Sequence, residues 1–122
     1  MQLGIVGLGR MGGNIARRLM LAGHHTVVHD RNAQAVTALE GEGSVGAADL
    51  AALVEKLQAP RAVWVMLPAG APTEQTIAQL ADLLEPGDSI IDGGNTFYKD
   101  DMRRAAELSQ RGLHYLDVGT SG

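Results

Sequence analysis

Apolar residues along the chain follow two alternating periodicities. Short continuous apolar runs, typical of buried strands, are separated by longer stretches in which apolar side chains recur at helical spacing, with Gly, Pro or Asp between them. The predicted strands are residues 2–6, 26–29, 44–45, 62–67, 89–92 and 113–118. The predicted helices are residues 11–22, 33–39, 49–57, 73–84 and 98–111. This alternation predicts βαβ units, and therefore an α/β fold with a doubly wound parallel sheet and helices on both faces.

The run from Ala62 to Leu67 is apolar at every position (Ala-Val-Trp-Val-Met-Leu). Continuous apolarity is expected of a central parallel strand that helices cover on both sides. We therefore predict that Trp64 belongs to the core and not to a site.

The turn after the first predicted strand is Gly7-Leu8-Gly9-Arg10-Met11-Gly12, a G-x-G-x-x-G placed between a strand and a helix. In this arrangement the first Gly permits a tight turn, the second lets a pyrophosphate approach the backbone, and the third lets the helix pack closely on the strand. Free N–H groups and the dipole at the helix N-terminus favour an anion there. The motif predicts a Rossmann-type dinucleotide site, in which Arg10 either approaches the phosphates or is a solvated residue at the helix start.

A carboxylate follows at the distance that such a site requires. Asp30 ends the second predicted strand and lies 18 residues after Gly12, close to the spacing of about 20 typical of a ribose-binding acidic residue. A carboxylate there accepts hydrogen bonds from the ribose hydroxyls and repels a 2′-phosphate, so NAD is predicted as cofactor ahead of NADP. Arg31 leaves the alternative open, because its guanidinium can stack on adenine or pair with a 2′-phosphate.

Three further turns follow predicted strands on the side where such sheets bind ligands. Leu67-Pro68-Ala69-Gly70 follows the central strand, and Gly119-Thr120-Ser121-Gly122 follows the last one. In Asp92-Gly93-Gly94-Asn95, two glycines expose the backbone, and Asn95 offers both an amide donor and a carbonyl acceptor. Asn95 is therefore either a site residue or only a helix cap.

Composition narrows the class of protein. The chain has 122 residues, 16 of them Gly, with 45% hydrophobic residues, no Cys and a formal net charge of −4. This length suffices for one domain with its own core, and the lack of Cys excludes thiolate catalysis and zinc–thiolate sites. The acidic balance and the 3% of aromatic residues are untypical of a nucleic-acid surface. We therefore expect no nucleic-acid partner. No apolar run approaches the roughly 18 residues of a membrane span, so we also expect no membrane partner and a cytoplasmic location.

Other polar residues give weaker signals. The four histidines lie around turns and strand ends without the spacing of metal ligands, so no metal site is predicted. A charged cluster in the last predicted helix is interpreted as a solvated helix face with i,i+3 and i,i+4 pairs. Its members are Lys99, Asp100, Asp101, Arg103 and Arg104.

Four segments together resemble the N-terminal coenzyme-binding domain of the 6-phosphogluconate dehydrogenase family. They are GLGRMG, MLPAG followed by PTEQTI, IIDGGNTFYKDD and DVGTSG, in the family's order, and the resemblance covers essentially the whole chain. Asp-Gly-Gly-Asn is the most specific of these motifs. The related β-hydroxyacid dehydrogenases share the first motif and the final Ser-Gly but usually carry another residue in place of the Asn.

The resemblance implies a reaction and a set of binding residues. The reaction is oxidative decarboxylation of 6-phosphogluconate to ribulose 5-phosphate, in the pentose phosphate pathway, by an enzyme that is a homodimer at full length. The implied residues are Gly7, Leu8, Gly9, Arg10, Met11 and Gly12 at the dinucleotide phosphates, Asp30, Arg31 and Asn32 at the adenosine ribose, Leu67, Pro68 and Ala69 along the cofactor, Asn95 between cofactor and sugar phosphate, and Ser121 and Gly122 at the substrate.

Some positions depart from the family's pattern. Family members that use NADP tend to have Ala in place of Gly9 and Asn-Arg-Thr in place of Asp30-Arg31-Asn32, so the chain resembles the NAD-preferring branch. Pro68 stands where the family has a Lys.

Length limits what the resemblance implies for catalysis. The family's catalytic Lys and Glu lie downstream of the Ser-Gly loop, so residues 1–122 are expected to be the dinucleotide-binding domain without the C-terminal helical domain. We expect Asn95 to assist catalysis and the chain alone to be inactive. Two alternatives remain open: a dehydrogenase of short β-hydroxy acids of the 3-hydroxyisobutyrate type, and a nucleotide-binding regulatory module that catalyses nothing.

Overall fold

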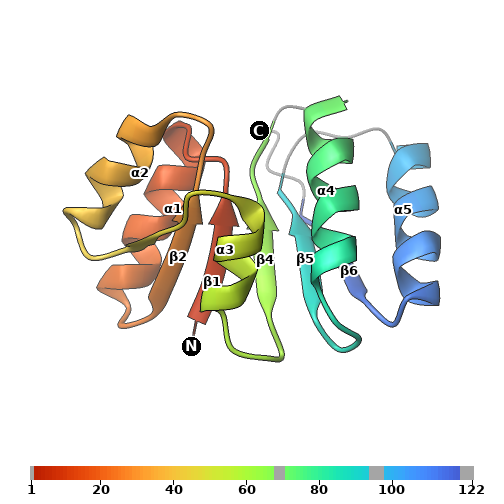
Figure 1. The fold of residues 1–122 in the computed structure, drawn as a ribbon. Coiled ribbons are helices and arrows are strands. Elements are labelled where there is room, and N and C mark those ends of the chain that lie inside the picture. Colours follow the sequence, from red (N-terminus) through yellow and green to blue (C-terminus); the bar gives the residue numbers. More distant parts are fainter. Residues whose placement is uncertain (1, 68–70, 94–97, 119–122) are drawn as a thin grey trace.

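A single parallel sheet organises the chain. The computed structural model describes residues 2–67, 71–93 and 98–118, and in this part six strands pair in the order β3-β2-β1-β4-β5-β6 (Figure 1). Every neighbouring pair is parallel. The strands are β1 (Gln2–Val6), β2 (His25–His29), β3 (Val45–Gly46), β4 (Ala62–Val65), β5 (Ser89–Asp92) and β6 (His114–Asp117). The predicted doubly wound α/β fold is confirmed.

Helices connect successive strands. They are α1 (Arg10–Leu21), α2 (Ala33–Glu40), α3 (Leu50–Lys56), α4 (Ala71–Leu83) and α5 (Tyr98–Gln110). Two predicted boundaries differ from the structure by two residues, and several others differ by one. Helix α4 begins at Ala71, before Pro72, because a proline in the first turn has no N–H that an intrahelical bond would need. Strand β4 ends at Val65 and not at Leu67, although the Met66 N–H still donates to the Val6 carbonyl at 2.7 Å.

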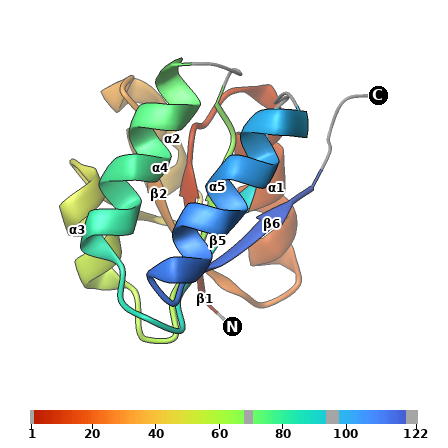
Figure 2. The ribbon, with the colours of Figure 1, turned by 90° about the vertical axis from the view of Figure 1, so that its right-hand side faces the viewer.

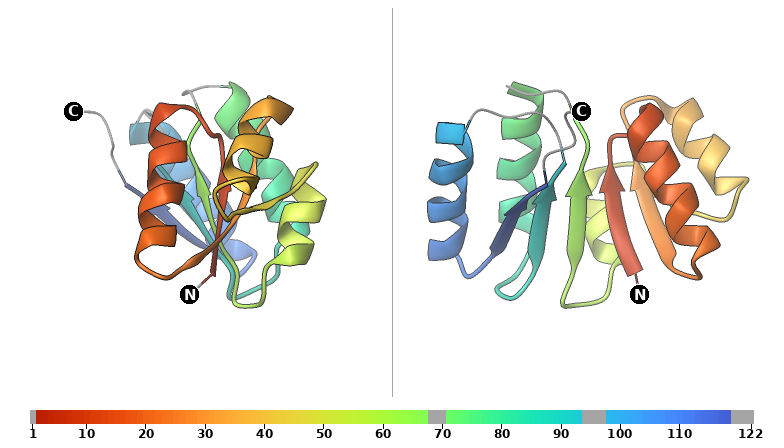
Figure 3. Two further views of the ribbon diagram at one scale, coloured as in Figure 1. Left: turned by 90° about the vertical axis from the view of Figure 1, so that its left-hand side faces the viewer. Right: turned by 180° about the vertical axis from the view of Figure 1, so that it is seen from behind.

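The two faces of the sheet have separate cores. Helices α1 and α2 cover one face of β1 and β2, whereas α3, α4 and α5 cover the opposite face of the sheet (Figures 1 and 3). On the first face Ile5 and Val28 pack with Ala16 of α1. On the second face, β4 and β5 pack on residues of α3, α4 and α5 such as Leu80. The chain changes faces between β3 and β4, so β1 and β4 form the switch point of the sheet.

The face shared by α1 and α2 has no helix over β4, β5 and β6 in the described residues (Figure 3). Trp64 and Ile91 are half-buried there against the α1–α2 core, and Leu116, opposite Ile91 in the register, is 54% exposed. Trp64 packs against the core as predicted, but it is only half-buried, because the described residues place no helix over this face of β4; the predicted cover on both sides of this strand is wrong. Its indole Nε1 is buried without a hydrogen-bond partner in the described part of the chain.

Asp88 and Arg61 form a largely buried ion pair at the amino ends of β4 and β5. Asp88, 1% exposed, accepts the backbone N–H groups of Arg61 at 2.6 Å and Glu85 at 2.8 Å, and the Arg61 guanidinium lies 3.2 Å from it. Burial alone would raise the pKa of the Asp88 carboxyl, but these backbone and guanidinium hydrogen bonds together outweigh it and hold the pKa below its usual range. Asp88 thus joins the segment before β4 to the turn before β5.

Candidate dinucleotide site

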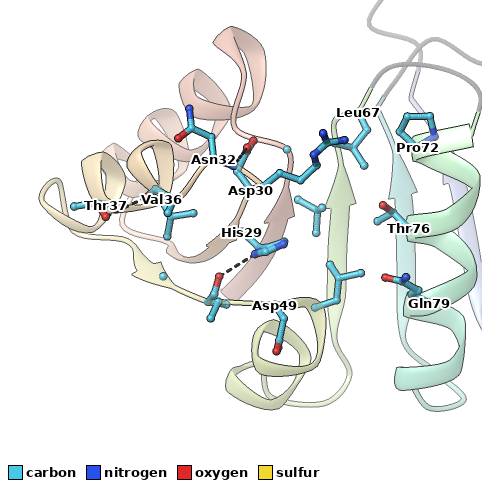
Figure 4. Close-up of a pocket in the computed structure, with 18 of the residues that line it drawn as sticks. His29, Asp30, Asn32, Val36, Thr37, Asp49, Leu67, Pro72, Thr76 and Gln79 are labelled. Atoms are coloured by element: carbon cyan, nitrogen blue, oxygen red, sulfur yellow. Dashed lines mark hydrogen bonds between the residues drawn. The ribbon is translucent and has the colours of Figure 1, made fainter.

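The carboxyl ends of β1, β2 and β4 border an open cavity of about 1310 Å³ (Figure 4). It lies beside the switch point, where open α/β sheets bind their ligands. Its lining includes five predicted residues, which come from three different turns and lie far apart in the sequence. They are Gly7, Asp30, Arg31, Asn32 and Leu67.

The three glycines of the first turn differ in the space that surrounds them. Gly7 has φ +96, and a Cβ there would collide with the Met66 carbonyl; a Cβ at Gly12 would collide with the carbonyl oxygen of Gly7. Packing of the protein itself therefore requires both glycines. A Cβ at Gly9 would meet nothing within 4 Å. The open space beside Gly9 fits the cradle that a diphosphate needs.

The N-terminus of α1 lacks the cap that other helices have. Gly9 is its N-cap and gives no side-chain hydrogen bond, and the first turn holds no acidic residue. In contrast, the Asn32 side chain caps α2 by accepting the Gln34 N–H at 3.0 Å, and the Asp49 side chain caps α3 by accepting the Ala52 N–H at 2.7 Å. The first N–H groups of α1 and the positive end of its dipole are thus available to an anion, which again fits a dinucleotide phosphate.

Asp30 links the second strand to this turn. Its Oδ2 accepts the Leu8 N–H at 2.6 Å, and its Oδ1 accepts the Asn32 N–H at 2.8 Å. A carboxylate has about four lone-pair sites, so two hydrogen bonds leave acceptor capacity on both oxygens. The side chain is half-buried at the rim of the cavity, where it can accept hydrogen bonds from a ribose.

Not every predicted residue belongs to the cavity. The other members of the first turn lie at the start of α1, outside the lining, and of these Gly9, Arg10 and Met11 are exposed. Leu8 and Gly12 complete that turn. Five further predicted positions lie outside the described residues: Pro68, Ala69, Asn95, Ser121 and Gly122.

Sequence reasoning missed the opposite wall and the floor of the cavity. Pro72, Thr76 and Gln79 of α4 form the wall, and their spacing of three to four residues places them on one helix face (Figure 4). His29, interpreted as an ordinary strand-end residue, lines the cavity and points its ring toward α4. The alternation along β2 could have found it, because His29 lies on the same side of the sheet as the buried Val27.

The interpretation of the charged cluster in α5 is wrong for Arg104. This side chain is 4% exposed and lies between α4 and α5, which run side by side over β5 and β6 (Figure 2). Its guanidinium is 3.4 Å from the buried Asp92 carboxylate, which also accepts the Tyr115 hydroxyl at 2.8 Å, and 3.5 Å from Glu74. The buried Leu108 four residues later shares the inward helix face, a spacing that could have indicated a buried arginine.

The rest of the cluster is only partly described. Arg103 is half-exposed and pairs with Glu74 and Glu107, as expected of a solvated face. The side chains of Lys99, Asp100 and Asp101 lie outside the described part. Among the described residues, no helix is long and apolar enough to cross a membrane, and no group of three His, Asp or Glu side chains is placed to hold a metal ion.

Comparisons with known proteins agree with this geometry. Residues 2–122 match the family model described as the NAD binding domain of 6-phosphogluconate dehydrogenase. The NAD(+)-dependent, decarboxylating 6-phosphogluconate dehydrogenase of Haloferax volcanii is 41% identical over 122 residues, which are 100% of this chain and 40% of that protein. The chain therefore spans about two fifths of the length of this relative.

Solved structures give the same picture. A Plasmodium falciparum 6-phosphogluconate dehydrogenase, studied in its apo form and with NADP+ or 6-phosphogluconate, superposes with a TM-score of 0.88 at 28% identity, over 100% of this chain and 27% of that one. A 3-hydroxyisobutyrate dehydrogenase from Salmonella typhimurium superposes with a TM-score of 0.85 at 30% identity, over 100% and 42%. By fold and by the match along its sequence, this chain belongs to the family of the NAD-binding domain of 6-phosphogluconate dehydrogenase.

Proposed function

We propose that residues 1–122 form the NAD-binding domain of an oxidoreductase that oxidises 6-phosphogluconate and releases CO₂ to give ribulose 5-phosphate. The observation that carries the dinucleotide part is the uncapped N-terminus of α1 beside the open space at Gly9, with Asp30 at the rim of the adjoining cavity. The similarity to proteins named as 6-phosphogluconate dehydrogenases supports the reaction.

Each part of the site has a distinct role in this proposal. The N–H groups of Arg10, Met11 and Gly12 receive the diphosphate, because no intrahelical acceptor is available to them in the first turn. Asp30 receives the adenosine ribose hydroxyls, and its hydrogen bond from Leu8 keeps the carboxylate beside the phosphate turn. Leu67, Pro68 and Ala69 lie along the cofactor where it crosses the switch point of the sheet. When bound, the nicotinamide supplies the hydride acceptor.

NAD is the proposed cofactor, with NADP second. Because Asp30 is proposed to contact the adenosine ribose, its carboxylate would repel the 2′-phosphate of NADP. Arg31 also lines the cavity, so a guanidinium is present that lessens this repulsion. Relatives of both kinds exist, since one is named as NAD(+)-dependent and another was studied with NADP+.

The substrate lies at the other end of the site in this proposal. Asn95 contacts both the cofactor and the sugar phosphate and assists catalysis, and Ser121 and Gly122 contact the substrate. Residues 1–122 hold no proposed acid or base for proton transfer, so this chain by itself is proposed to bind without turnover. The full-length protein is proposed to be a cytoplasmic homodimer, which its mass in solution and cell fractionation will test.

Separate titrations with NADH and NADPH test the cofactor proposal. Isothermal titration calorimetry of the chain is expected to show binding of both, with NADH tighter. Binding of neither would contradict a dinucleotide site, whereas clearly tighter NADPH binding would contradict only the role given to Asp30.

A dehydrogenase of short β-hydroxy acids is the second candidate, and the close superposition with a 3-hydroxyisobutyrate dehydrogenase favours it. The two reactions differ in their products, because a 3-hydroxyisobutyrate substrate can be oxidised without loss of a carboxyl group. The complete gene product should be given 6-phosphogluconate or 3-hydroxyisobutyrate with NAD, while NADH and CO₂ are measured. NADH formed with 3-hydroxyisobutyrate alone would replace the first proposal by the second.

A further inference from the structure

The imidazole of His29 is held in one orientation at the floor of the cavity. Its Nδ1 lies 2.9 Å from the carbonyl oxygen of Ala47, and the ring points toward the space bordered by Thr76 and Gln79 (Figure 4). The side chain is half-buried, and its Nε2 has no hydrogen-bond partner among the described residues. A ring nitrogen that is held in one orientation and faces a cavity is suited to recognise a ligand through a hydrogen bond.

The partner of Nδ1 determines what Nε2 can do. A carbonyl oxygen only accepts hydrogen bonds, so Nδ1 must carry the proton that it donates to Ala47. In a neutral imidazole the other nitrogen is then an acceptor. The carbonyl of Ala47 therefore sets His29 Nε2 as an acceptor directed at the cavity.

The cavity is also where the base of a bound dinucleotide belongs, and this step rests on the proposed function. The diphosphate is assigned to the start of α1 and the ribose to Asp30, which immediately follows His29. From Asp30 the cavity extends between Leu67 and Pro72 on one side and α3 on the other. A planar base attached to the ribose would then enter the space toward which the His29 ring and its Nε2 point.

We propose that His29 Nε2 accepts a hydrogen bond from the exocyclic amino group of adenine, and so selects adenine over bases with an oxo group at that position. In hypoxanthine, an oxygen acceptor replaces the amino donor, and two acceptors then face each other. The hydroxyl of Thr76 and the amide of Gln79 can each turn to present a donor or an acceptor, so neither enforces this choice. His29 does, because Ala47 fixes its tautomer.

The test compares NAD with nicotinamide hypoxanthine dinucleotide, which differs from NAD only in the base, where an oxo group replaces the amino group at C6 and N1 carries a proton. Calorimetric titration of the full chain is expected to show about five- to tenfold tighter binding of NAD, the size of one net hydrogen bond. In His29→Phe this ratio is expected to fall close to one, mainly because NAD binding weakens. A ratio that is near one in the wild type, or unchanged in His29→Phe, would overturn the proposal.

Two matched variants control for nonspecific effects. His25 is exposed at the opposite end of β2, so His25→Phe makes the same substitution away from the cavity and should keep the wild-type ratio. Thr76→Val removes an adaptable hydroxyl from the opposite wall and should weaken both dinucleotides equally. If either control loses the discrimination, selection does not reside in His29. If wild-type chain binds neither dinucleotide, the proposed function itself fails.

A measurement on the wild type avoids any folding defect of His29→Phe. Nitrogen NMR of the labelled chain distinguishes a protonated ring nitrogen from an unprotonated one. We expect His29 to be protonated at Nδ1, and its Nε2 signal to shift toward a hydrogen-bonded position with NAD and less with the hypoxanthine analogue. An Nε2 that is protonated at neutral pH, or that responds equally to both ligands, would refute the role of His29.

Discussion

The Asp30 carboxylate accepts the backbone N–H of Leu8 at 2.6 Å, across 22 residues of sequence. This hydrogen bond fastens the end of β2 to the turn between β1 and α1, so the proposed ribose acceptor and the proposed phosphate turn are positioned together. The same side chain also accepts the Asn32 N–H, which begins α2. A change at Asp30 is therefore expected to act on the proposed ribose contact and also on the shape of the turn.

Replacing Asp30 by Ala should weaken NAD binding more than NADP binding. The variant loses charge-assisted hydrogen bonds to the ribose, which are worth about 1.5–3 kcal/mol, or roughly tenfold to a hundredfold in affinity. NADP loses less, because removal of the carboxylate also removes repulsion of the 2′-phosphate. Titration calorimetry with both cofactors checks this difference. Equal losses for the two cofactors would indicate that Asp30 only supports the Leu8 turn.

Two glycines of the first turn should respond oppositely to the same methyl group. Gly9→Ala should leave the unfolding midpoint unchanged, because its Cβ meets nothing, yet weaken NAD binding severalfold, because the methyl group enters the open space assigned to the diphosphate. Gly12→Ala should destabilise the fold by about 2 kcal/mol or more, because its Cβ collides with the Gly7 carbonyl. Thermal unfolding and calorimetry separate the two effects. Strong destabilisation by Gly9→Ala would contradict the assignment of open space to a ligand.

Arg103 and Arg104 are neighbours in α5 but should contribute differently to the stability of the fold. Arg104→Met should destabilise the chain by about 3 kcal/mol, because the buried Asp92 carboxylate loses its guanidinium neighbour. Tyr115→Phe, which removes the hydroxyl that donates to Asp92, should cost about 1 kcal/mol. Arg103→Met is the control, and its half-exposed ion pairs should contribute less than about 1 kcal/mol. Urea unfolding of the three variants gives the order, and equal effects of Arg103 and Arg104 would contradict the buried network.

The sequence predicts the sheet and the turn between β1 and α1 because both depend on local patterns. Apolar runs identify the strands, although one face of β4 and β5 has no helix in the described residues, and the spacing from Gly12 to Asp30 reflects one βαβ unit of ordinary size. The floor and wall of the cavity depend instead on how distant elements pack. The His29 ring is oriented at the cavity by the Ala47 carbonyl, and Arg104 is buried beside Asp92 and Glu74, which lie far from it in the sequence. Charge alone could not distinguish Arg104 from Arg103.

The buried Asp88 carboxylate should make stability depend on acid pH. Its pKa is lowered in the folded chain, so the ionised form contributes stability above the ordinary aspartate pKa of about 3.9, and this contribution disappears as pH falls through the folded pKa. Asp88→Asn should lower the free energy of unfolding at neutral pH by about 2 kcal/mol, because the neutral amide cannot replace both accepting oxygens. The difference from wild type should narrow steadily below about pH 4.

Glu42 provides the control for Asp88, since its pKa is also lowered, mainly by the side-chain hydrogen bond from Arg17. The Glu42 side chain is 43% exposed and the Arg17 side chain 45%, so water and salt screen the ion pair between them. Glu42→Gln should therefore leave the unfolding midpoint and its pH dependence unchanged. Urea unfolding from pH 2 to pH 7 compares the two variants with wild type. If Asp88→Asn runs parallel to wild type across that range, the carboxylate is not the source of acid sensitivity, and the Arg61 contacts act only through geometry.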